Sequence, residues 1–137
     1  MAALNRPSVS SYEIHENVRV DTQDNEDHTF CGIMFPIQAK ADLPVSQLVI
    51  RSVAVRGHLG PLTVWVTKED VPMEQENYCV SSLQSIRSDE SMWAKIYEKN
   101  HNPSRRTYQT LDFSDNPIIM KPGQMKVLYI HSSAPND

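Results

Sequence analysis

The chain contains five histidines, and imidazole is the commonest metal ligand among protein side chains. The histidines are His15, His28, His58, His101 and His131. A cupin-like site would need two histidines at alternate positions of one strand together with a carboxylate, and a structural zinc site would need closely spaced pairs of ligands. The sequence contains neither His-X-His nor Cys-X-X-Cys. We therefore predict that the chain has no metal site.

Nucleophilic catalysis would need a serine or cysteine held beside a base. His28 and Cys31 lie three positions apart in a run that alternates like a strand, so their side chains point to opposite faces. Cys31 shares its face with the apolar Ile33 and Phe35, which predicts an inert, buried thiol. The Gly-X-Ser-X-Gly, Gly-X-Gly-X-X-Gly and P-loop patterns do not occur, and we predict no cofactor. A triad of distant residues is recognised by geometry alone, so a small jelly-roll enzyme, such as an isomerase or cyclase, stays an alternative.

Exposed aromatic and arginine side chains are the remaining candidates, and the chemistry that they suit is binding. Trp65 lies opposite an apolar face, where it either covers a second core or forms a platform for a ligand, because Trp is enriched at binding hot spots. Trp93 poses the same choice beside a long loop. An arginine pair precedes Tyr108, whose ring can stack with a guanidinium group. The candidate binding residues are Trp65, Trp93, Tyr97, Arg105, Arg106 and Tyr108.

The elements that position these residues are short strands, since apolar residues alternate with polar ones over most of the chain after residue 28. The alternating runs predict strands at 28–40, 45–56, 62–67, 92–99, 106–113, 118–120 and 124–132. We expect the first strand to lie at a sheet edge or to be bulged at Pro36, because Pro36 cannot donate a hydrogen bond. We expect the second to be buried on both faces, and to form a hairpin with the third through the loop at 57–61.

This pattern of strands and turns predicts an all-β fold, an antiparallel β-sandwich or jelly roll of about seven or eight strands. Residues 1–27 are predicted to be a polar, acidic N-terminal arm, and residues 28–137 to be the sandwich domain. The stretch at 68–91 has no sustained period, and a loop of that length is typically functional or mobile.

Charge and cysteine content restrict the partners and the compartment. The net charge of −4 argues against nucleic acid, which needs clustered Lys and Arg, and no apolar run is long enough to span a membrane. Cys31 and Cys79 are expected to be reduced core thiols, with one disulfide as the alternative. The sequence shows neither an apolar stretch after Met1 nor an Asn-X-Ser/Thr sequon. We therefore expect a cytoplasmic or nuclear protein.

Several segments resemble, in their order, β-sandwich interaction modules of larger eukaryotic proteins, including the PHR-type domains of ubiquitin-ligase adaptors and galactose-binding-like domains. The segments that carry this resemblance are Phe30–Phe35, Gly60–Val66, Trp93–Tyr97, Tyr108–Phe113, Pro117–Ile118, Lys121–Gly123 and Leu128–Ser132. The resemblance covers roughly residues 28 to 132 and implies a protein-binding adaptor module.

The sequence favours a non-enzymatic binding module that recognises another protein through the loops at the ends of the sandwich. The alternative is a carbohydrate-binding domain of the lectin or galactose-binding type. Such a domain would use Trp65 or Trp93 as a stacking platform, and Asn100, Asn102 or Arg106 as polar contacts.

Overall fold

A computed structural model describes residues 30–70 and 89–136 of the chain. Its elements are β1 (Phe30–Gln38), β2 (Leu48–Ile50), β3 (Ser52–Gly57), β4 (Gly60–Thr67), the 3-10 helix η1 (Glu90–Met92), β5 (Trp93–His101), β6 (Ser104–Asp112), β7 (Ile118–Met120) and β8 (Met125–Asn136). Every strand pairing is antiparallel. The predicted all-β sandwich is confirmed. The predicted N-terminal arm, most of the long loop and Cys79 lie outside the described residues.

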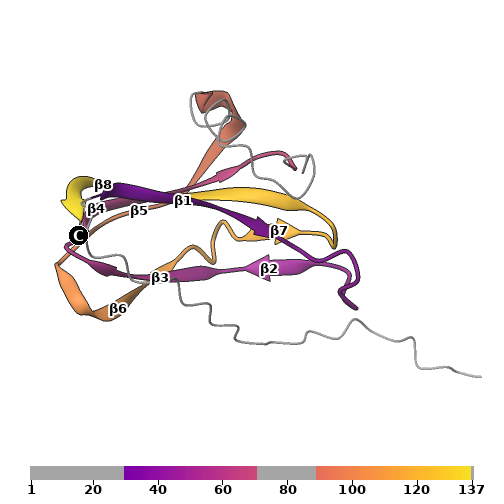
Figure 1. Cartoon of the computed structure of the whole chain (residues 1–137), viewed down its shortest axis with the longest axis horizontal. Coiled ribbons are helices and arrows are strands. Elements are labelled where there is room, and N and C mark those ends of the chain that lie inside the picture. Colours follow the sequence, from indigo (N-terminus) through magenta and orange to yellow (C-terminus); the bar gives the residue numbers. More distant parts are fainter. Residues whose placement is uncertain (1–29, 71–88, 137) are drawn as a thin grey trace, which may run out of the picture.

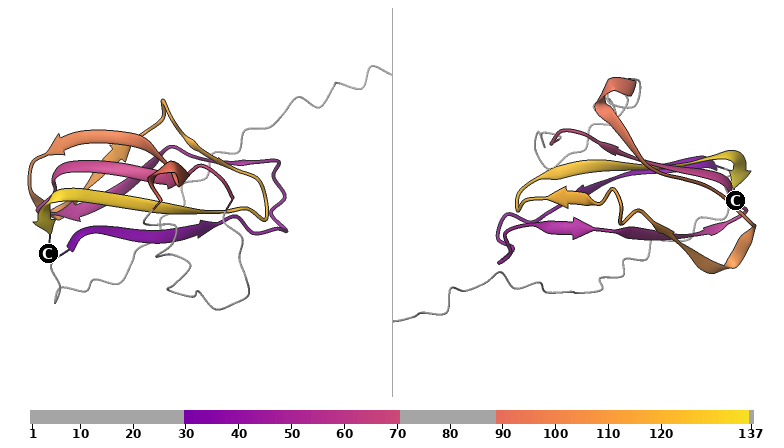
Figure 2. Two further views of the ribbon diagram at one scale, coloured as in Figure 1. Left: turned by 90° about the horizontal axis from the view of Figure 1, so that it is seen from above. Right: turned by 180° about the vertical axis from the view of Figure 1, so that it is seen from behind.

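Two layers of strands make up the sandwich (Figure 1). One layer is a four-stranded sheet in the order β1-β8-β4-β5, in which β1 and β5 are the edges. The view from above shows these four strands side by side (Figure 2). None of the described residues belongs to a helix that could cross a membrane.

The second layer is a narrow ribbon made from two pairs, β3 with β6 and β2 with β7. The two pairs follow one another because only Arg51 separates β2 from β3, while residues 113–117 separate β6 from β7. The backbone N–H of Phe113 donates to the carbonyl oxygen of Arg51 at 2.9 Å and joins the two pairs at this point. The ribbon is therefore one long antiparallel pair of segments with a five-residue excursion on one side.

The main hydrophobic core lies between the sheet and the ribbon. Alternate residues of β4 and β8 point inward from the sheet, and alternate residues of β6 and β7 meet them from the ribbon, as the two-residue period of strands requires. The buried side chains of this core are Ala39, Leu59, Leu62, Val64, Val66, Leu111, Phe113, Ile118, Met120, Leu128 and Ile130. The predicted alternation of the last strand, with Leu128 and Ile130 on one face and Val127 and Tyr129 on the other, matches this arrangement.

The predicted hairpin through residues 57–61 is wrong. β3 pairs with β6, whereas β4 pairs with β5 and β8, so the chain crosses from the ribbon to the sheet at this loop. The physical reason is the backbone of the loop, in which Gly57, Leu59 and Gly60 all have positive φ angles. Leu59 is 3% exposed and packs into the core, so the loop forms a corner of the sandwich.

Two expectations about burial are also wrong. The segment at 45–56 is not buried on both faces, because Ser52, Ala54 and Arg56 face solvent from the ribbon. Cys31 is free and exposed instead of buried. Its strand, β1, is an edge strand as predicted, and its first residues extend beyond the cover of the narrow ribbon, as the 47% exposure of Ile33 shows.

Candidate functional site

The outer face of the four-stranded sheet carries aromatic side chains from neighbouring strands. The sheet register places Met34, Tyr129, Trp65 and Lys95 in one row across β1, β8, β4 and β5. The next row contains Gly32, His131, Thr63 and Glu98. Trp93 lies on the same face, beside Thr67. We call the surface formed by Met34, Trp65, Trp93, Tyr129 and His131 the aromatic face.

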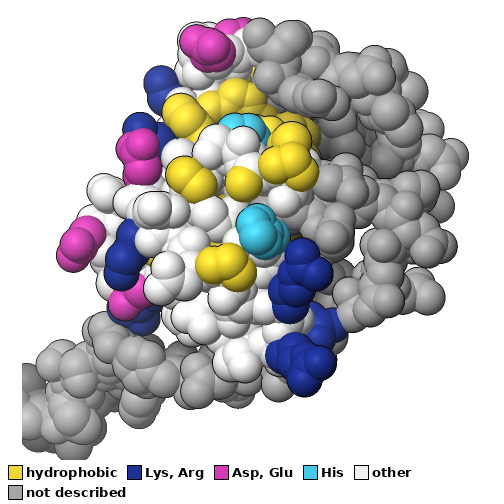
Figure 3. Space-filling view, turned by 90° about the vertical axis from the view of Figure 1, so that its left-hand side faces the viewer, with side chains coloured by type: hydrophobic (Ala, Val, Ile, Leu, Met, Phe, Trp, Pro, Cys, Tyr) yellow, Lys and Arg dark blue, Asp and Glu magenta, His cyan; other side chains and the backbone are white. Residues whose placement is uncertain are grey.

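A second, smaller hydrophobic cluster supports the aromatic face. Its buried members are Trp93, Met125 and Val127, with 8%, 3% and 0% exposure. Met34, Trp65, Met92 and Tyr129 pack against them and are half-buried. The upper part of Figure 3, on the side of the sheet, shows hydrophobic side chains grouped at the surface. Trp65 therefore belongs to a second cluster and also keeps part of its surface accessible.

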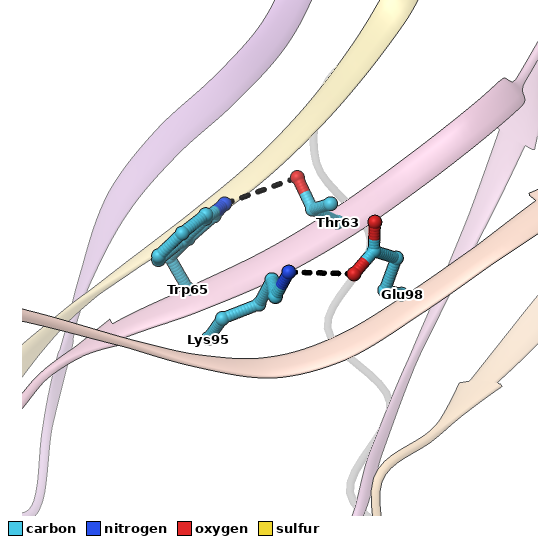
Figure 4. A network of polar contacts seen from close by, with 4 residues as sticks. All are labelled: Thr63, Trp65, Lys95 and Glu98. Atoms are coloured by element: carbon cyan, nitrogen blue, oxygen red, sulfur yellow. Dashed lines mark hydrogen bonds and ion pairs between the residues drawn. The ribbon is translucent and has the colours of Figure 1, made fainter.

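Polar contacts hold Trp65 and its neighbours on β5 in place (Figure 4). The indole N–H of Trp65 donates to the hydroxyl oxygen of Thr63 at 3.0 Å. The ammonium group of Lys95 lies 5.7 Å from the centroid of the Trp65 ring. Lys95 also forms an ion pair of 2.5 Å with Glu98, and both charged groups are largely in solvent. The indole thus has a hydrogen-bonded edge and a cation near its ring.

Tyr129 occupies the centre of the aromatic face. Its ring meets the ring of Trp93 edge-on, with centroids 6.2 Å apart and an interplanar angle of 61°, and it lies 5.6 Å from the ring of His131. On the neighbouring strand, a Cβ atom on Gly32 would lie 3.0 Å from the Tyr129 ring and 2.5 Å from the carbonyl oxygen of Ile130. Glycine at this position therefore lets the Tyr129 ring lie close to the backbone of β1.

Tyr97 does not join the aromatic face, although the sequence places it on one face with Trp93 and Lys95. A β-bulge between Val64 and Trp65 in the pairing of β4 with β5 shifts the register, so Tyr97 pairs with the inward-facing Val64. Its hydroxyl group is hydrogen-bonded to Nε2 of His101 at 2.5 Å, and the two rings stack with centroids 5.8 Å apart. Tyr97 therefore lies at the edge between the two layers, and its predicted role in binding stays a prediction.

The protonation of this pair follows from its surroundings. Burial lowers the pKa of His101, and the positive charge of Lys99 lowers it further. Burial also raises the pKa of Tyr97, with a smaller contribution from the negative charge of Asp112. Both shifts favour the neutral forms of the two side chains, so the hydrogen bond between the Tyr97 hydroxyl and Nε2 of His101 joins two uncharged groups.

A polar cavity of about 310 Å³ lies at the turn between β5 and β6, next to this pair. We call it the turn pocket, and it is lined by Lys99, Asn100, His101, Asn102, Pro103, Ser104 and Gln109. Ser104 links its wall, because its hydroxyl donates to the carbonyl oxygen of Thr107 at 2.6 Å and accepts from the Gln109 amide at 3.2 Å. The lining is rich in hydrogen-bond donors and contains no carboxylate.

The remaining predicted residues lie apart from the aromatic face. Tyr108 is 40% exposed on the ribbon, where the guanidinium group of Arg56 lies 5.3 Å from its ring centroid. The stacking of Tyr108 with an arginine is therefore present, with Arg56 as the partner. Arg105 and Arg106 are exposed at the start of β6, beside the turn pocket. The structure brings Trp65 and Trp93 together and separates them from the other four candidates.

Three residues that the structure places in these surfaces, Tyr129, His131 and His101, were not among the predicted binding residues. Tyr129 and His131 were recognisable as one face of the last strand, but nothing in the sequence showed that β4 and its Trp65 would lie beside them. His101 was considered as a metal ligand, and no metal site was predicted. Its place in the turn pocket depends on the bulge in the pairing of β4 with β5, for which the sequence carries no signal.

Comparison with known proteins adds no functional assignment to this geometry. The chain matches no protein-family model, and comparison with curated proteins and with solved structures finds no significant match. The similarity to PHR-type and galactose-binding-like sandwiches therefore stays an expectation based on the order of strands. Within residues 30–70 and 89–136, no group of three or more His, Cys, Asp or Glu side chains is placed to hold a metal ion.

Proposed function

We propose that the chain is a non-enzymatic binding module that recognises another protein through the aromatic face of its four-stranded sheet. One observation carries this proposal. The outer face of an antiparallel sheet that covers a core on its other side is ordinarily polar, whereas here Trp65, Tyr129 and His131 lie side by side on it and are half-buried. A contiguous aromatic patch on an outer face marks an interaction site.

The composition of the aromatic face suits a protein partner. Trp, Tyr and Met are enriched at the centres of protein interfaces, and Trp65, Tyr129 and Met34 form one row of this face. Lys95 and Glu98 lie at the β5 edge and supply a polar rim of both charge signs. We expect the partner to present aliphatic or aromatic side chains to the row and polar groups to the rim.

Two contacts argue against a sugar as the ligand of the aromatic face. Stacking of a sugar on an indole needs an open ring face, and the ammonium group of Lys95 already lies 5.7 Å from the Trp65 centroid. The indole N–H is also engaged with Thr63. Moreover, Asn100 and Asn102, the expected polar contacts of the carbohydrate alternative, line the turn pocket instead of the aromatic face.

An enzyme of the isomerase or cyclase type has less support from the described geometry. Such an enzyme would bring several histidines or carboxylates into one enclosed cavity. The turn pocket contains His101 alone among such groups. We therefore place binding before catalysis.

The proposal is tested by affinity capture from cell extract with the whole chain and two single variants, followed by direct binding of each purified captured protein. Trp65→Ala removes the indole that lies beside Tyr129 on the aromatic face, and Tyr108→Ala removes an exposed aromatic side chain from the ribbon as a matched control. We expect Trp65→Ala to weaken binding by about 2 kcal/mol or more, which is roughly thirtyfold, and Tyr108→Ala to leave binding unchanged.

Because Trp65 also supports the small cluster, a variant outside that cluster is needed. Lys95→Glu reverses an exposed charge at the rim and is expected to keep the fold while weakening the same complex. Equal binding by the wild type, Trp65→Ala and Lys95→Glu would contradict the proposal. Hits on a glycan array that Trp65→Ala abolishes would favour the carbohydrate alternative.

A further inference from the structure

The turn pocket lies at one end of the sandwich, where two loops from different layers meet. Gly57 of β3 pairs with Ser104 of β6, and Gly60 of β4 pairs with His101 of β5. The loop between β3 and β4 therefore lies beside the turn between β5 and β6. Figure 3 looks onto this end of the molecule.

Positive charge gathers at this end, although the net charge of the chain is −4. The segments 56–60 and 99–106 contain four Lys and Arg residues and two histidines but no Asp or Glu. These residues are Arg56, His58, Lys99, His101, Arg105 and Arg106. The lower right part of Figure 3 shows a group of Lys and Arg side chains with no acidic side chain among them.

Charges in this group are not all neutralised by the protein. Among the residues that the structure describes, neither Lys99 nor Arg106 has a carboxylate within ion-pair distance. The nearest acidic residue along β6 is Asp112, whose carboxylate accepts hydrogen bonds from the backbone N–H of Ser114 at 2.9 Å and from its hydroxyl at 2.5 Å. These two bonds lower the pKa of Asp112 and keep its carboxyl group ionised, and its negative charge acts on Tyr97 beside the turn pocket.

The pocket wall supplies the groups that bind an oxyanion. Tyr97, Lys99 and His101 occupy alternate positions of the edge strand β5 and lie on the side that faces the ribbon, while Gln109 approaches from β6 on the opposite side. Residues that carry side-chain amides, a hydroxyl, an imidazole and an ammonium group thus line one open pocket of about 310 Å³. A phosphate group accepts several hydrogen bonds at once and is attracted by a lysine charge.

We propose that the turn pocket binds a small anion of the phosphate class, either free phosphate or a phosphomonoester. Lys99 provides the charge, and the side chains of Asn100, Asn102 and His101 provide donors. Arg106, just outside the pocket, raises the local concentration of anions. The inference is independent of the aromatic face, because the two surfaces share none of their lining residues.

An anion in the pocket would change the titration of His101. Burial and the charge of Lys99 keep the pKa of His101 below its ordinary value, and Tyr97 and Asp112 are the other titratable groups nearby. A bound phosphate places negative charge opposite Lys99 and favours the imidazolium form. Binding should therefore raise the pKa of His101.

The test is an NMR titration of the isotopically labelled full chain with sodium phosphate, compared with sodium chloride at equal ionic strength. We expect saturable shifts confined to residues 99–109 and a rise in the pKa of His101 in phosphate only. Lys99→Gln should weaken binding by about tenfold. Lys121→Gln is the matched control, because Lys121 lies in the turn between β7 and β8, outside the turn pocket. This variant should bind phosphate like the wild type. Arg106→Gln should weaken binding less, since its charge acts from outside the pocket.

Three further ligands separate the sources and the alternatives. Phosphoserine that binds more tightly than inorganic phosphate would identify an esterified phosphate as the ligand, and the reverse order would identify free phosphate. Acetate that binds as tightly as phosphate would overturn the proposal. The proposal would also fail if chloride caused the same chemical-shift changes as phosphate, or if Lys99→Gln left those changes unaltered. Galactose that shifts the same resonances would overturn the phosphate proposal in favour of the carbohydrate alternative.

Trp65→Ala should keep phosphate binding, because Trp65 does not line the turn pocket. Failure of the phosphate proposal is therefore distinguishable from failure of the proposed protein binding by the aromatic face.

Discussion

At the scale of single residues, Thr67 shows how the second cluster is built under the aromatic face. Thr67 is fully buried at the end of β4, where an apolar residue would be expected. Its hydroxyl oxygen accepts a hydrogen bond from the backbone N–H of Val127 at 3.0 Å. This bond continues the contact between β4 and β8 beyond their last paired residues, Val66 and Leu128. The threonine is therefore both a packing residue and a backbone partner.

We predict that Thr67→Val destabilises the fold by about 1–3 kcal/mol, because it keeps the volume and leaves the buried N–H of Val127 without an acceptor. Thr67→Ser keeps the acceptor and loses one methyl group, so it should cost no more than about 1 kcal/mol. Urea unfolding followed by circular dichroism measures both values. A larger cost for Thr67→Ser than for Thr67→Val would show that packing, and not the hydrogen bond, is what Thr67 provides.

The sequence identified the tryptophans of the aromatic face, but it did not show which side chains lie beside them. Trp65 stood out because it lies opposite an apolar strand face, and Trp93 stood out because it lies beside a long loop. Tyr129 could not be joined to them, since the contact depends on β8 pairing with β4 across 60 residues or more of chain. Cys31 was misjudged because alternation identifies a face but not how far the opposite layer extends beneath it.

At the scale of elements, the corner between β3 and β4 decides the topology. The chain changes layers within Gly57, His58, Leu59 and Gly60, and three of these residues have positive φ angles. Leu59 turns inward at the corner, and the hydroxyl of Ser132 donates to its carbonyl oxygen. From the sequence, two β-rich runs around a short glycine-containing loop predicted a hairpin, because that is the usual outcome of the pattern. The backbone angles that make this loop a corner between the two layers, and not a hairpin turn, cannot be inferred from residue types alone.

We predict that Gly60→Ala destabilises the fold by about 1–2 kcal/mol, because Gly60 has a φ of 78° and its new Cβ would lie 3.2 Å from that of Ala134. Gly60→Asn adds the same Cβ but tolerates the left-handed region better, so it should cost less than Gly60→Ala. Thermal unfolding of the two variants gives the comparison. Equal costs would point to the contact with Ala134 as the sole cause.

At the scale of the whole molecule, the two layers differ in width, and this difference shapes both surfaces. A two-stranded ribbon covers the inner face of a four-stranded sheet, so the edge at β5 and β6 is open enough for the turn pocket. The outer face of the same sheet carries its own small cluster, with Val127 fully buried beneath aromatic neighbours. The sandwich thus has one large core, one small cluster and a basic end.

The class of fold was predictable at this scale, because turn signals and alternation together left no room for long helices. The assignment of strands to the two layers could not be predicted from the sequence, because it depends on pairing between strands that are far apart in the chain. The proposed binding surface therefore differs from the predicted one. The sequence favoured the loops at the ends of the sandwich, whereas we propose the aromatic face, which depends on the pairing of β8 with β4.

The most direct test of the aromatic face as the protein-binding surface is site-specific photo-crosslinking from two exposed positions. A photoreactive amino acid at Lys95 lies at the β5 edge of the aromatic face, and one at Thr110 lies on the ribbon, on the opposite layer. We predict that the captured partner crosslinks from position 95 and not from position 110, and that Trp65→Ala abolishes the crosslink. Efficient crosslinking from position 110 with none from position 95 would contradict the account and place the binding surface on the ribbon.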